Sequence, residues 1–487
     1  MSPLSRLALL WTLPAVLGLP NSTPLATPTP SPVEQRDVAS FVGGVGNDIV
    51  SAVSDVGQFF QDLPTGTAVE KALGISASDL AAKPTEVLNL PSYGNWTDDG
   101  WNVLVHGNVY KVPNTTQSKL DDLANVFLVG TDIEDLSPAE QNQARNLTAS
   151  IYVVQQGEVN VTITFVNDVD VDPQNDGGAV NAAGGAQSIQ LPDETTSQGD
   201  FGAWLLLANT TGPNPKDGYL VPGNITDRVQ TLSMYASGTN TGNATAYLVP
   251  PKGVTIISDI DDILRITKIW DPKEGLLNSF ARPFTPWMNM PDIYSDWSQT
   301  NRDFHFHYLT TTPEQATRNY MEFIFAKYPI GSFDTRPLNF SDVSATLSIR
   351  KFLLDRIFQT FPERKFILVG DTSNSDVMKA YPQLNKDYPG NVLCILLRNS
   401  SSTDSTDHFP YDTSGFEGMP QSQYMFFNVP DDLRGLDVAK GECYNVTVRQ
   451  NVTFGLQGFS LDSGTGVPRP NVWGLVLGLG VIFGLVF

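Results

Sequence analysis

The sequence predicts an α/β domain with a Rossmann-type parallel sheet, preceded by a β-rich domain resembling a sandwich or barrel. Two patterns lead to this fold class. From about 95 to 250, short runs of alternating apolar and polar residues are separated by Gly, Asn and Pro, which is typical of antiparallel strands. From 251 to 440, short apolar runs alternate with longer helical stretches, which favours a parallel sheet. A length of 487 residues fits such a multidomain chain.

The composition narrows the classes of function. The chain has 52 acidic and 30 basic residues, a net charge of −22, and only 17% charged residues. A surface this negative repels phosphate backbones, so we expect no nucleic-acid partner. The two cysteines, Cys394 and Cys443, exclude a disulfide-rich scaffold and a cysteine-ligated zinc finger.

The first residues predict entry into the secretory pathway. Arg6 precedes an apolar run at 7–19, as in a signal peptide spanning 1–20; an N-terminal membrane anchor is the alternative. A Pro/Thr-rich linker follows at 21–37, and a helical segment is expected within 38–94. Apolar residues at helical spacing between 49 and 60 predict a helix that packs on a domain rather than on lipid. Export would permit a Cys394–Cys443 disulfide.

The last residues predict attachment to a membrane. An extension at 441–470 leads to an uncharged apolar tail at 471–487. As a helix this tail reaches only about 25 Å, which is short for a membrane span. A GPI-attachment signal with Ser463 or Gly464 as the acceptor fits best; a short transmembrane anchor or a buried hairpin remains open. The protein is therefore expected at the cell surface, anchored by its tail, or secreted.

Asn-X-Ser/Thr triplets occur throughout the chain beyond the signal and predict heavy N-glycosylation, although a Thr/Asn-rich composition could also produce them by chance. They begin at Asn95, Asn114, Asn146, Asn160, Asn209, Asn224, Asn243, Asn339, Asn399, Asn445 and Asn451. Glycans would supply the surface polarity that the few charged side chains do not.

The individual elements follow in order. In the β-rich half, strands are expected at 101–110, 149–154, 159–165 and 202–208, with a long exposed loop at 173–200. In the α/β half, strands are expected at 253–259, 304–308, 365–371 and 392–397, and helices at 314–327 and 348–360. Ligands of parallel sheets bind at the carboxyl ends of the strands.

Polar side chains gather at those carboxyl ends. Asp259 and Asp261 end the first strand, Thr310, Thr311 and Thr312 end the second, and Asp371 and Asp376 follow the strand at 365–371. Arg350 and Lys351 are available from a helix. So many carboxylates need a cation, and oxygen ligands favour Mg²⁺. In such a site an aspartate can attack phosphorus, a second carboxylate can transfer protons, and the threonines can bind phosphate.

The order of these motifs resembles the haloacid dehalogenase (HAD) phosphatase superfamily. Within it, the segments 257–263, 306–313, 327–332 and 361–371 resemble the catalytic domain of fungal and bacterial phosphatidate phosphatases of the actin-patch protein type. This resemblance implies a HAD-like fold and the hydrolysis of a phosphomonoester, phosphatidate above all, to diacylglycerol. The implied partners are a phospholipid or another phosphomonoester substrate, and the membrane through the C-terminal tail.

The resemblance also implies residue roles. Asp259 would be the nucleophile, Asp261 the general acid/base and Thr310 a phosphate ligand. Asp371 would bind Mg²⁺ with Asp259 and the main chain of Asp261, supported by Asp376. The basic residue of the third motif is either Arg350 or Lys351. Ile263 replaces the usual threonine, so a hydroxyl is lost.

Several alternatives remain. His305 and His307 share a strand face and could contribute to a zinc site, or they could be ordinary packed residues. An apolar group between the first two motifs could accept acyl chains or form a packed core: Phe280, Phe284, Trp287, Met288 and Met290. A Gly-x-Ser-x-Gly elbow is absent, which disfavours a serine esterase. The rival functions are a surface binding or adhesive glycoprotein with a degenerate phosphatase domain and a phosphatase of soluble substrates.

Overall fold

The computed structural model describes residues 66–128, 130–166, 186–208, 228–301, 303–336, 344–403, 411–450 and 453–457. All of them belong to one unit, Gln35–Phe487. The predicted signal peptide, linker, helix at 49–60 and apolar tail lie outside these ranges, as do the sequons at Asn209, Asn224, Asn339 and Asn451. Within the ranges, every helix is too short or too polar to cross a bilayer.

The β-rich half forms a single nine-stranded sheet, in the order β1-β3-β2-β9-β8-β5-β6 with β4 and β7 also paired to β3. All pairs are antiparallel except β2 with β9. The strands are β1 (Glu86–Asn89), β2 (Ser92–Thr97), β3 (Gly100–Lys111), β4 (Val154–Gln155), β5 (Thr162–Val166), β6 (Ala186–Gln190), β7 (Asp200–Leu206), β8 (Gln230–Ala236) and β9 (Asn243–Val249). The antiparallel prediction is confirmed in this sheet, whereas a sandwich or barrel is not.

Three segments of this half differ from the expected elements. The run at 149–154 is the end of a helix, α6 (Pro138–Ile151), because Ser137 and Glu140 form a capping box and Pro138 occupies the first turn. Strand β6 lies inside the segment predicted as a loop, and β1 and β2 begin inside the predicted helical segment. The predicted helical segment at 38–94 also contains two short helices, α3 (Thr67–Leu73) and α4 (Ala77–Ala81). Helix α5 (Gln117–Ala124) lies between β3 and α6.

The α/β half contains a six-stranded, entirely parallel sheet in the order β12-β11-β10-β13-β14-β16. The strands are β10 (Val254–Ser258), β11 (His305–Pro313), β12 (Ser332–Arg336), β13 (Lys365–Asp371), β14 (Val392–Arg398) and β16 (Tyr424–Phe427). The helices are α7 (Pro272–Phe280), α8 (Met290–Thr300), α9 (Glu314–Lys327), α10 (Ser344–Thr360), α11 (Ser375–Asp387) and α12 (Ser400–Thr403). A small sheet pairs β15 (Tyr411–Asp412) with β17 (Leu456–Gln457). The predicted parallel sheet is therefore confirmed.

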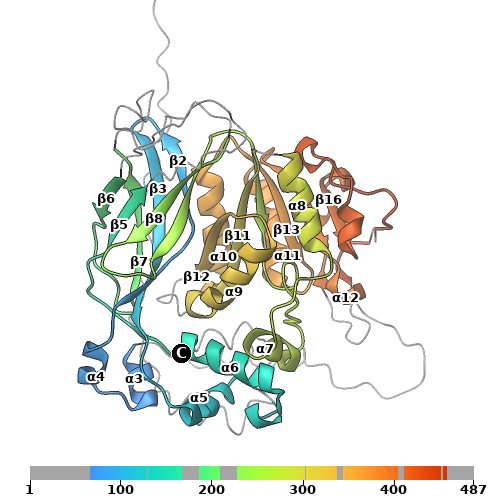
Figure 1. Cartoon of the computed structure of the whole chain (residues 1–487). Coiled ribbons are helices and arrows are strands. Elements are labelled where there is room, and N and C mark those ends of the chain that lie inside the picture. Colours follow the sequence, from blue (N-terminus) through green and yellow to red (C-terminus); the bar gives the residue numbers. More distant parts are fainter. Residues whose placement is uncertain are drawn as a thin grey trace, which may run out of the picture. The chain divides into compact units, whose positions relative to one another are not determined.

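Successive residues of the central strands pack into two different cores. Ile256 lies in the core that α8 and α9 cover, whereas Ile257 lies in the core that α10 and α11 cover. Figure 1 shows these helix pairs on the two faces of the parallel sheet. Such alternation is expected of a strand buried on both sides.

The β-rich sheet is packed onto the α/β half. Tyr93 and Tyr247 lie in the same core as α10, and the main-chain N–H of Phe333 donates a hydrogen bond to the carbonyl of Pro91 at 2.8 Å. A disulfide joins Cys394 of β14 to Cys443, with a Cα–Cα distance of 5.3 Å. The predicted pairing of these cysteines is thus present.

Candidate active site

Asp259 follows β10 directly and is almost fully buried at 2% exposure. Its Oδ1 accepts hydrogen bonds from the N–H of Ile260 at 3.0 Å and from Nη2 of Arg350 at 3.3 Å. Its Oδ2 accepts one from Nδ2 of Asn374 at 3.2 Å. Burial raises the pKa of Asp259, the Arg350 charge opposes this rise, and the nearby Asp261 charge adds to it.

The two candidate basic residues are placed very differently. Arg350 is 1% exposed and bonded to Asp259, while its Nε and Nη1 are buried without a hydrogen-bond partner in the described structure. Lys351 is 52% exposed and pairs with Asp355 and Asp387 on the surface. The structure therefore brings Arg350, and not Lys351, to the predicted nucleophile.

Asp371, the last residue of β13, is a second buried carboxylate near Asp259. Its Oδ2 accepts hydrogen bonds from the N–H and hydroxyl of Ser373 and from the hydroxyl of Ser400, the latter at 2.8 Å. Its Oδ1 is buried and has no hydrogen-bond partner in the described structure. Burial and the charges of Asp262 and Asp259 outweigh these bonds and raise the pKa of Asp371 to about 7.

The carboxylates of Asp261 and Asp262 have different surroundings. Asp261 is paired with Arg265, at 2.7 Å from Nη2. Asp262 is fully buried, has a φ of 59°, and accepts hydrogen bonds from the N–H groups of Thr267, Lys268 and Ile269 at 2.8–3.1 Å. Asp262 thus shapes the loop after the first motif.

Thr310 lies on β11, the strand that pairs with β10, near the end of the sheet where Asp259 follows β10. Its side chain is buried, at 2% exposure. Its Oγ1 accepts a hydrogen bond from the N–H of Thr312 at 3.1 Å. Thr311 and Thr312 are half-buried, and α9 begins two residues later, so the three threonines lie just before a helix N-terminus. A phosphate-binding role for these threonines stays a prediction, which rests on their place before this helix.

The four carboxylates predicted to bind a metal are not gathered into one group. In the described ranges, no cluster of three or more His, Cys, Asp or Glu side chains is arranged to hold a metal ion. Asp261 turns to Arg265, and Asp376 lies in the first turn of α11, where its charge helps to raise the pKa of Arg350. Asp259 and Asp371 remain as the two adjacent buried carboxylates.

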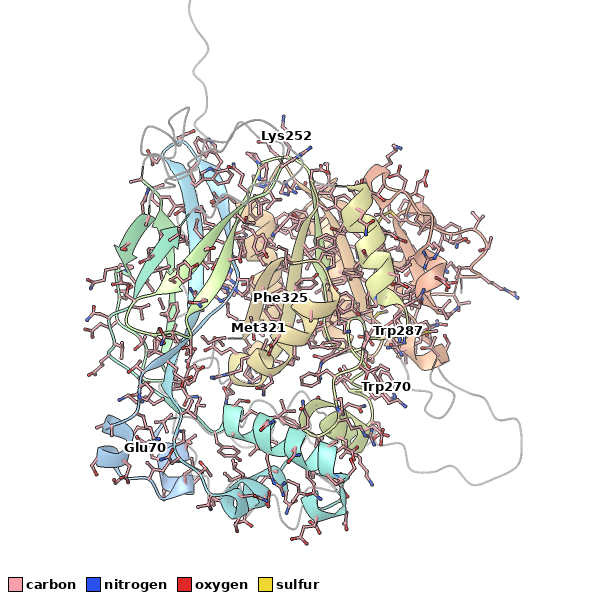
Figure 2. All side chains as sticks on the ribbon, viewed as in Figure 1. Glu70, Lys252, Trp270, Trp287, Met321 and Phe325 are labelled. Carbon is pink, nitrogen blue, oxygen red and sulfur yellow. A yellow bond between two sulfur atoms is a disulfide. The ribbon has the colours of Figure 1, made fainter. Side chains whose placement is uncertain are left out.

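Two further expectations concern residues that the structure places in packed cores. Ile263 is fully buried in the core under α8 and α9. The apolar group between the first two motifs is mainly packed. Its core residues are Phe280, Trp287 and Met290, and Phe284 is half-buried. Met288 is the exposed member of the group, at 57%. The guanidinium of Arg398 lies 4.2 Å from the ring centroid of Trp287 and 5.9 Å from that of Trp270; Figure 2 labels both tryptophans.

His305 and His307 do share a face, as predicted, but they are bonded within the protein. Both rings contact the hydroxyl of Ser332 at 2.8 Å, and Nε2 of His307 lies 3.4 Å from Asp334. Both side chains are buried. The packed interpretation of these histidines is the one that the structure supports.

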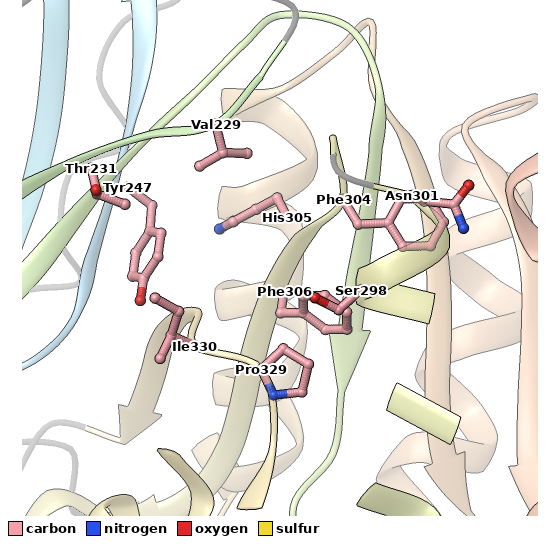
Figure 3. Close-up of a pocket in the computed structure, with 10 residues that line it drawn as sticks. All are labelled: Val229, Thr231, Tyr247, Ser298, Asn301, Phe304, His305, Phe306, Pro329 and Ile330. Carbon is pink, nitrogen blue, oxygen red and sulfur yellow. The ribbon is translucent and has the colours of Figure 1, made fainter. Parts of the chain in front are cut away.

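A cavity of about 330 Å³ lies elsewhere, at the start of β11 (Figure 3). Its lining includes Tyr247, His305, Phe306 and Ile330. His305 precedes Thr310 by five residues, or about 16 Å of extended strand. The cavity is therefore at the end of the sheet opposite to Asp259.

Sequence reasoning missed Asn374, Ser373 and Ser400. The first two lie inside the Gly-Asp motif, between Asp371 and Asp376. Ser400 follows β14 by two residues. The other site residues were predicted because they lie at the carboxyl ends of strands. The same criterion, applied to the end of β14, would have identified Ser400 as well.

Comparison with known proteins agrees with this geometry. Residues 254–399 match the family model described as "Phosphatidate phosphatase APP1, catalytic domain". A Saccharomyces cerevisiae protein named "Phosphatidate phosphatase APP1" is 29% identical over 173 residues, which cover 34% of this chain and 29% of that protein. The similarity to a phosphatidate phosphatase catalytic domain, predicted from the motifs, is thus confirmed for residues 254–399.

Proposed function

We propose that the α/β half of this chain is a phosphatase that hydrolyses a phosphomonoester through a covalent phosphoenzyme on Asp259. One observation carries the proposal: a buried aspartate at a strand end is held by Arg350 and Asn374 beside a second buried carboxylate, Asp371. The match of residues 254–399 to a phosphatase catalytic domain supports it.

In the proposed reaction, an oxygen of Asp259 forms a bond to phosphorus as the bond to the leaving oxygen breaks. Asp261 gives its proton to that leaving oxygen. Asp261 then takes a proton from water, which attacks phosphorus and releases Asp259 and inorganic phosphate. The N–H groups of Arg350 that have no partner among the described residues, and the hydroxyl of Thr310, would bind the phosphoryl oxygens.

We propose Mg²⁺ as the cofactor, held by Asp259 and Asp371. The donors fit, because both are buried carboxylates and Oδ1 of Asp371 has no hydrogen-bond partner in the described structure. When bound, the ion would neutralise charge on the phosphoryl group. Asp376 is proposed to act indirectly, through Arg350.

The proposed substrate is phosphatidate, with diacylglycerol as the product. The support is the printed name of the family and of the yeast relative. Because the matched segment covers 29% of that relative, the substrate of this chain needs its own assay. The packed residues between the first two motifs do not distinguish a lipid from a soluble phosphomonoester.

We further propose an exported, N-glycosylated and tail-anchored protein. The Cys394–Cys443 disulfide supports export, and the exposure of Asn114, Asn146, Asn160 and Asn243 supports glycosylation. The anchor is proposed from the uncharged apolar sequence at 471–487 alone. Release of the cell-surface protein by a GPI-specific phospholipase would support the anchor, and no release would contradict a GPI linkage.

The decisive experiment measures phosphate release from a panel of phosphomonoesters, including phosphatidate in mixed micelles, with Mg²⁺ and with EDTA. We expect turnover that requires Mg²⁺ and falls by at least about 10³-fold in Asp259→Asn, because the nucleophile is lost. The melting temperature of the variant serves as the folding control. Unchanged turnover in Asp259→Asn would refute the nucleophile, and binding without any turnover would support the rival binding protein.

A further inference from the structure

The carboxylate of Asp261 is bound through one oxygen. Oδ1 accepts hydrogen bonds from Nε of Arg265 at 3.0 Å, from Nη2 of Arg265 at 2.7 Å and from the hydroxyl of Thr267 at 2.8 Å. Across the described residues, no hydrogen bond reaches Oδ2. The side chain of Asp261 is 15% exposed, so this second oxygen is not enclosed in the core.

Arg265 is itself held firmly. Its side chain is 2% exposed, and its guanidinium lies 4.5 Å from the ring centroid of Tyr320 and 5.3 Å from that of Phe284. Nη2 also donates to the hydroxyl of Ser279 at 3.3 Å. A buried guanidinium packed against two aromatic rings that also contact each other has little freedom, so the oxygen that it binds is fixed as well.

From this arrangement we infer that Arg265 and Thr267 are positioning residues, which hold Oδ1 of Asp261 so that Oδ2 alone exchanges protons with substrate and water. The inference rests on the proposed function. In the first step Oδ2–H gives its proton to the leaving oxygen while the P–O bond breaks. In the second step the same oxygen removes a proton from the attacking water as the bond between phosphorus and Asp259 breaks. Three donors on Oδ1 make that oxygen the poorer proton acceptor.

The test compares two substrates that differ in their need for an acid. An alkyl phosphate such as phosphatidate has a poor leaving group and needs protonation, whereas para-nitrophenyl phosphate has a good one and does not. The variants Arg265→Gln, Arg265→Lys and Thr267→Val are measured in the full chain with Mg²⁺. Arg282→Gln is the matched control, because it removes another arginine–carboxylate pair of this segment, with Glu274.

We expect Arg265→Gln to lower kcat for phosphatidate by about 10- to 100-fold with little change in KM, which is part of the usual contribution of a general acid. The formation of the phosphoenzyme from para-nitrophenyl phosphate, measured as the rate of the nitrophenolate burst, should slow less than about 3-fold, because this leaving group needs no acid. Hydrolysis of the phosphoenzyme is common to both substrates and should slow equally for both. Arg265→Lys should recover part of the loss, since it restores a cation. Thr267→Val should show the same substrate dependence with a smaller loss, and Arg282→Gln should leave both rates unchanged.

Equal losses in the rate of phosphoenzyme formation from the two substrates, or unchanged rates, would overturn the inference. If Arg265→Gln does not fold, Thr267→Val decides, because valine keeps the shape of the buried threonine and removes only the hydroxyl. A wild-type chain that is inactive on every ester would instead refute the proposed function itself. The two failures are therefore distinguishable.

Discussion

Arg350 and Lys351 are neighbours in sequence, but only one of them reaches the site. Helix α10 directs Arg350 into the protein, where it bonds to Asp259, and leaves Lys351 on the surface with Asp355 and Asp387. The order of the motifs alone therefore does not identify which of the two residues reaches the site. Local helix geometry does, because consecutive residues point in directions about 100° apart.

We expect Arg350→Gln to lower kcat about 10²- to 10³-fold, because a buried donor to the phosphoryl oxygens is lost. Lys351→Gln should change kcat less than about 2-fold, since exposed ion pairs contribute little. Phosphate release from the same substrate, with melting temperatures for both variants, checks this. The assignment fails if Lys351→Gln is the more damaging substitution.

Some of the other site residues could be predicted from sequence, and others could not, because their roles depend on contacts made only in the folded chain. Asp259, Thr310 and Asp371 were predicted because each lies at or just after the carboxyl end of an expected strand, and these ends meet at one edge of a parallel sheet. The role of Asn374 depends on a contact 115 residues away, and the pairing of Asp261 with Arg265 depends on a loop conformation fixed by Asp262. Neither follows from periodicity or from motif spacing.

At the scale of elements, apolar strands were predictable and polar ones were not. Strand β13 coincides with its predicted bounds, because its apolar residues are buried on both faces. Strand β12 carries Asp334 and Arg336, and its polar composition hides a buried strand. The end of α6 contains Ile151, whose apolar neighbours imitate a strand, but the capping box at Ser137 commits the segment to a helix.

The disulfide links β14 to the segment after the parallel sheet, and we expect it to raise the free energy of unfolding by a measurable amount. Cys394 lies in β14 and Cys443 lies 49 residues later, in the segment that follows the parallel sheet. Closing a loop of this length in the unfolded chain corresponds to about 4 kcal/mol. We expect the double variant Cys394→Ala/Cys443→Ala to melt several degrees lower than the wild type, and dithiothreitol to lower only the wild-type melting temperature. A wild type insensitive to complete reduction would contradict this expectation.

The two halves of the molecule meet at a buried charged cluster. Asp334 of β12 is fully buried; Nη2 of Arg356 lies 2.8 Å from it, and the Nε2 atoms of His106 and His307 lie 3.3 and 3.4 Å away. His106 comes from β3 of the β-rich sheet, and its Nε2 also lies 3.1 Å from the carbonyl oxygen of Phe333. Removing either charge of such a buried pair is costly, so the cluster ties the β-rich sheet to the α/β half.

This junction predicts a pH dependence of stability. Burial lowers the pKa of His106 to about 4, with the Asp334 charge opposing this effect and the Arg356 and His307 charges adding to it. The unfolded chain binds this proton near pH 6.5, so it takes up more protons than the folded chain between pH 6.5 and 4. His106 therefore costs stability as the pH falls through this window, by at most about 3 kcal/mol.

Asp371 acts in the opposite direction, because its pKa is raised to about 7 and its protonated form favours the folded state. The pH dependence of the free energy of unfolding therefore contains contributions of opposite sign from His106 and Asp371. A comparison of variants separates the two contributions. We expect the melting temperature of His106→Gln to fall less steeply between pH 6.5 and 4 than that of the wild type, whatever its value at pH 7. Parallel curves for the two proteins would show that His106 is not held neutral by burial at this junction.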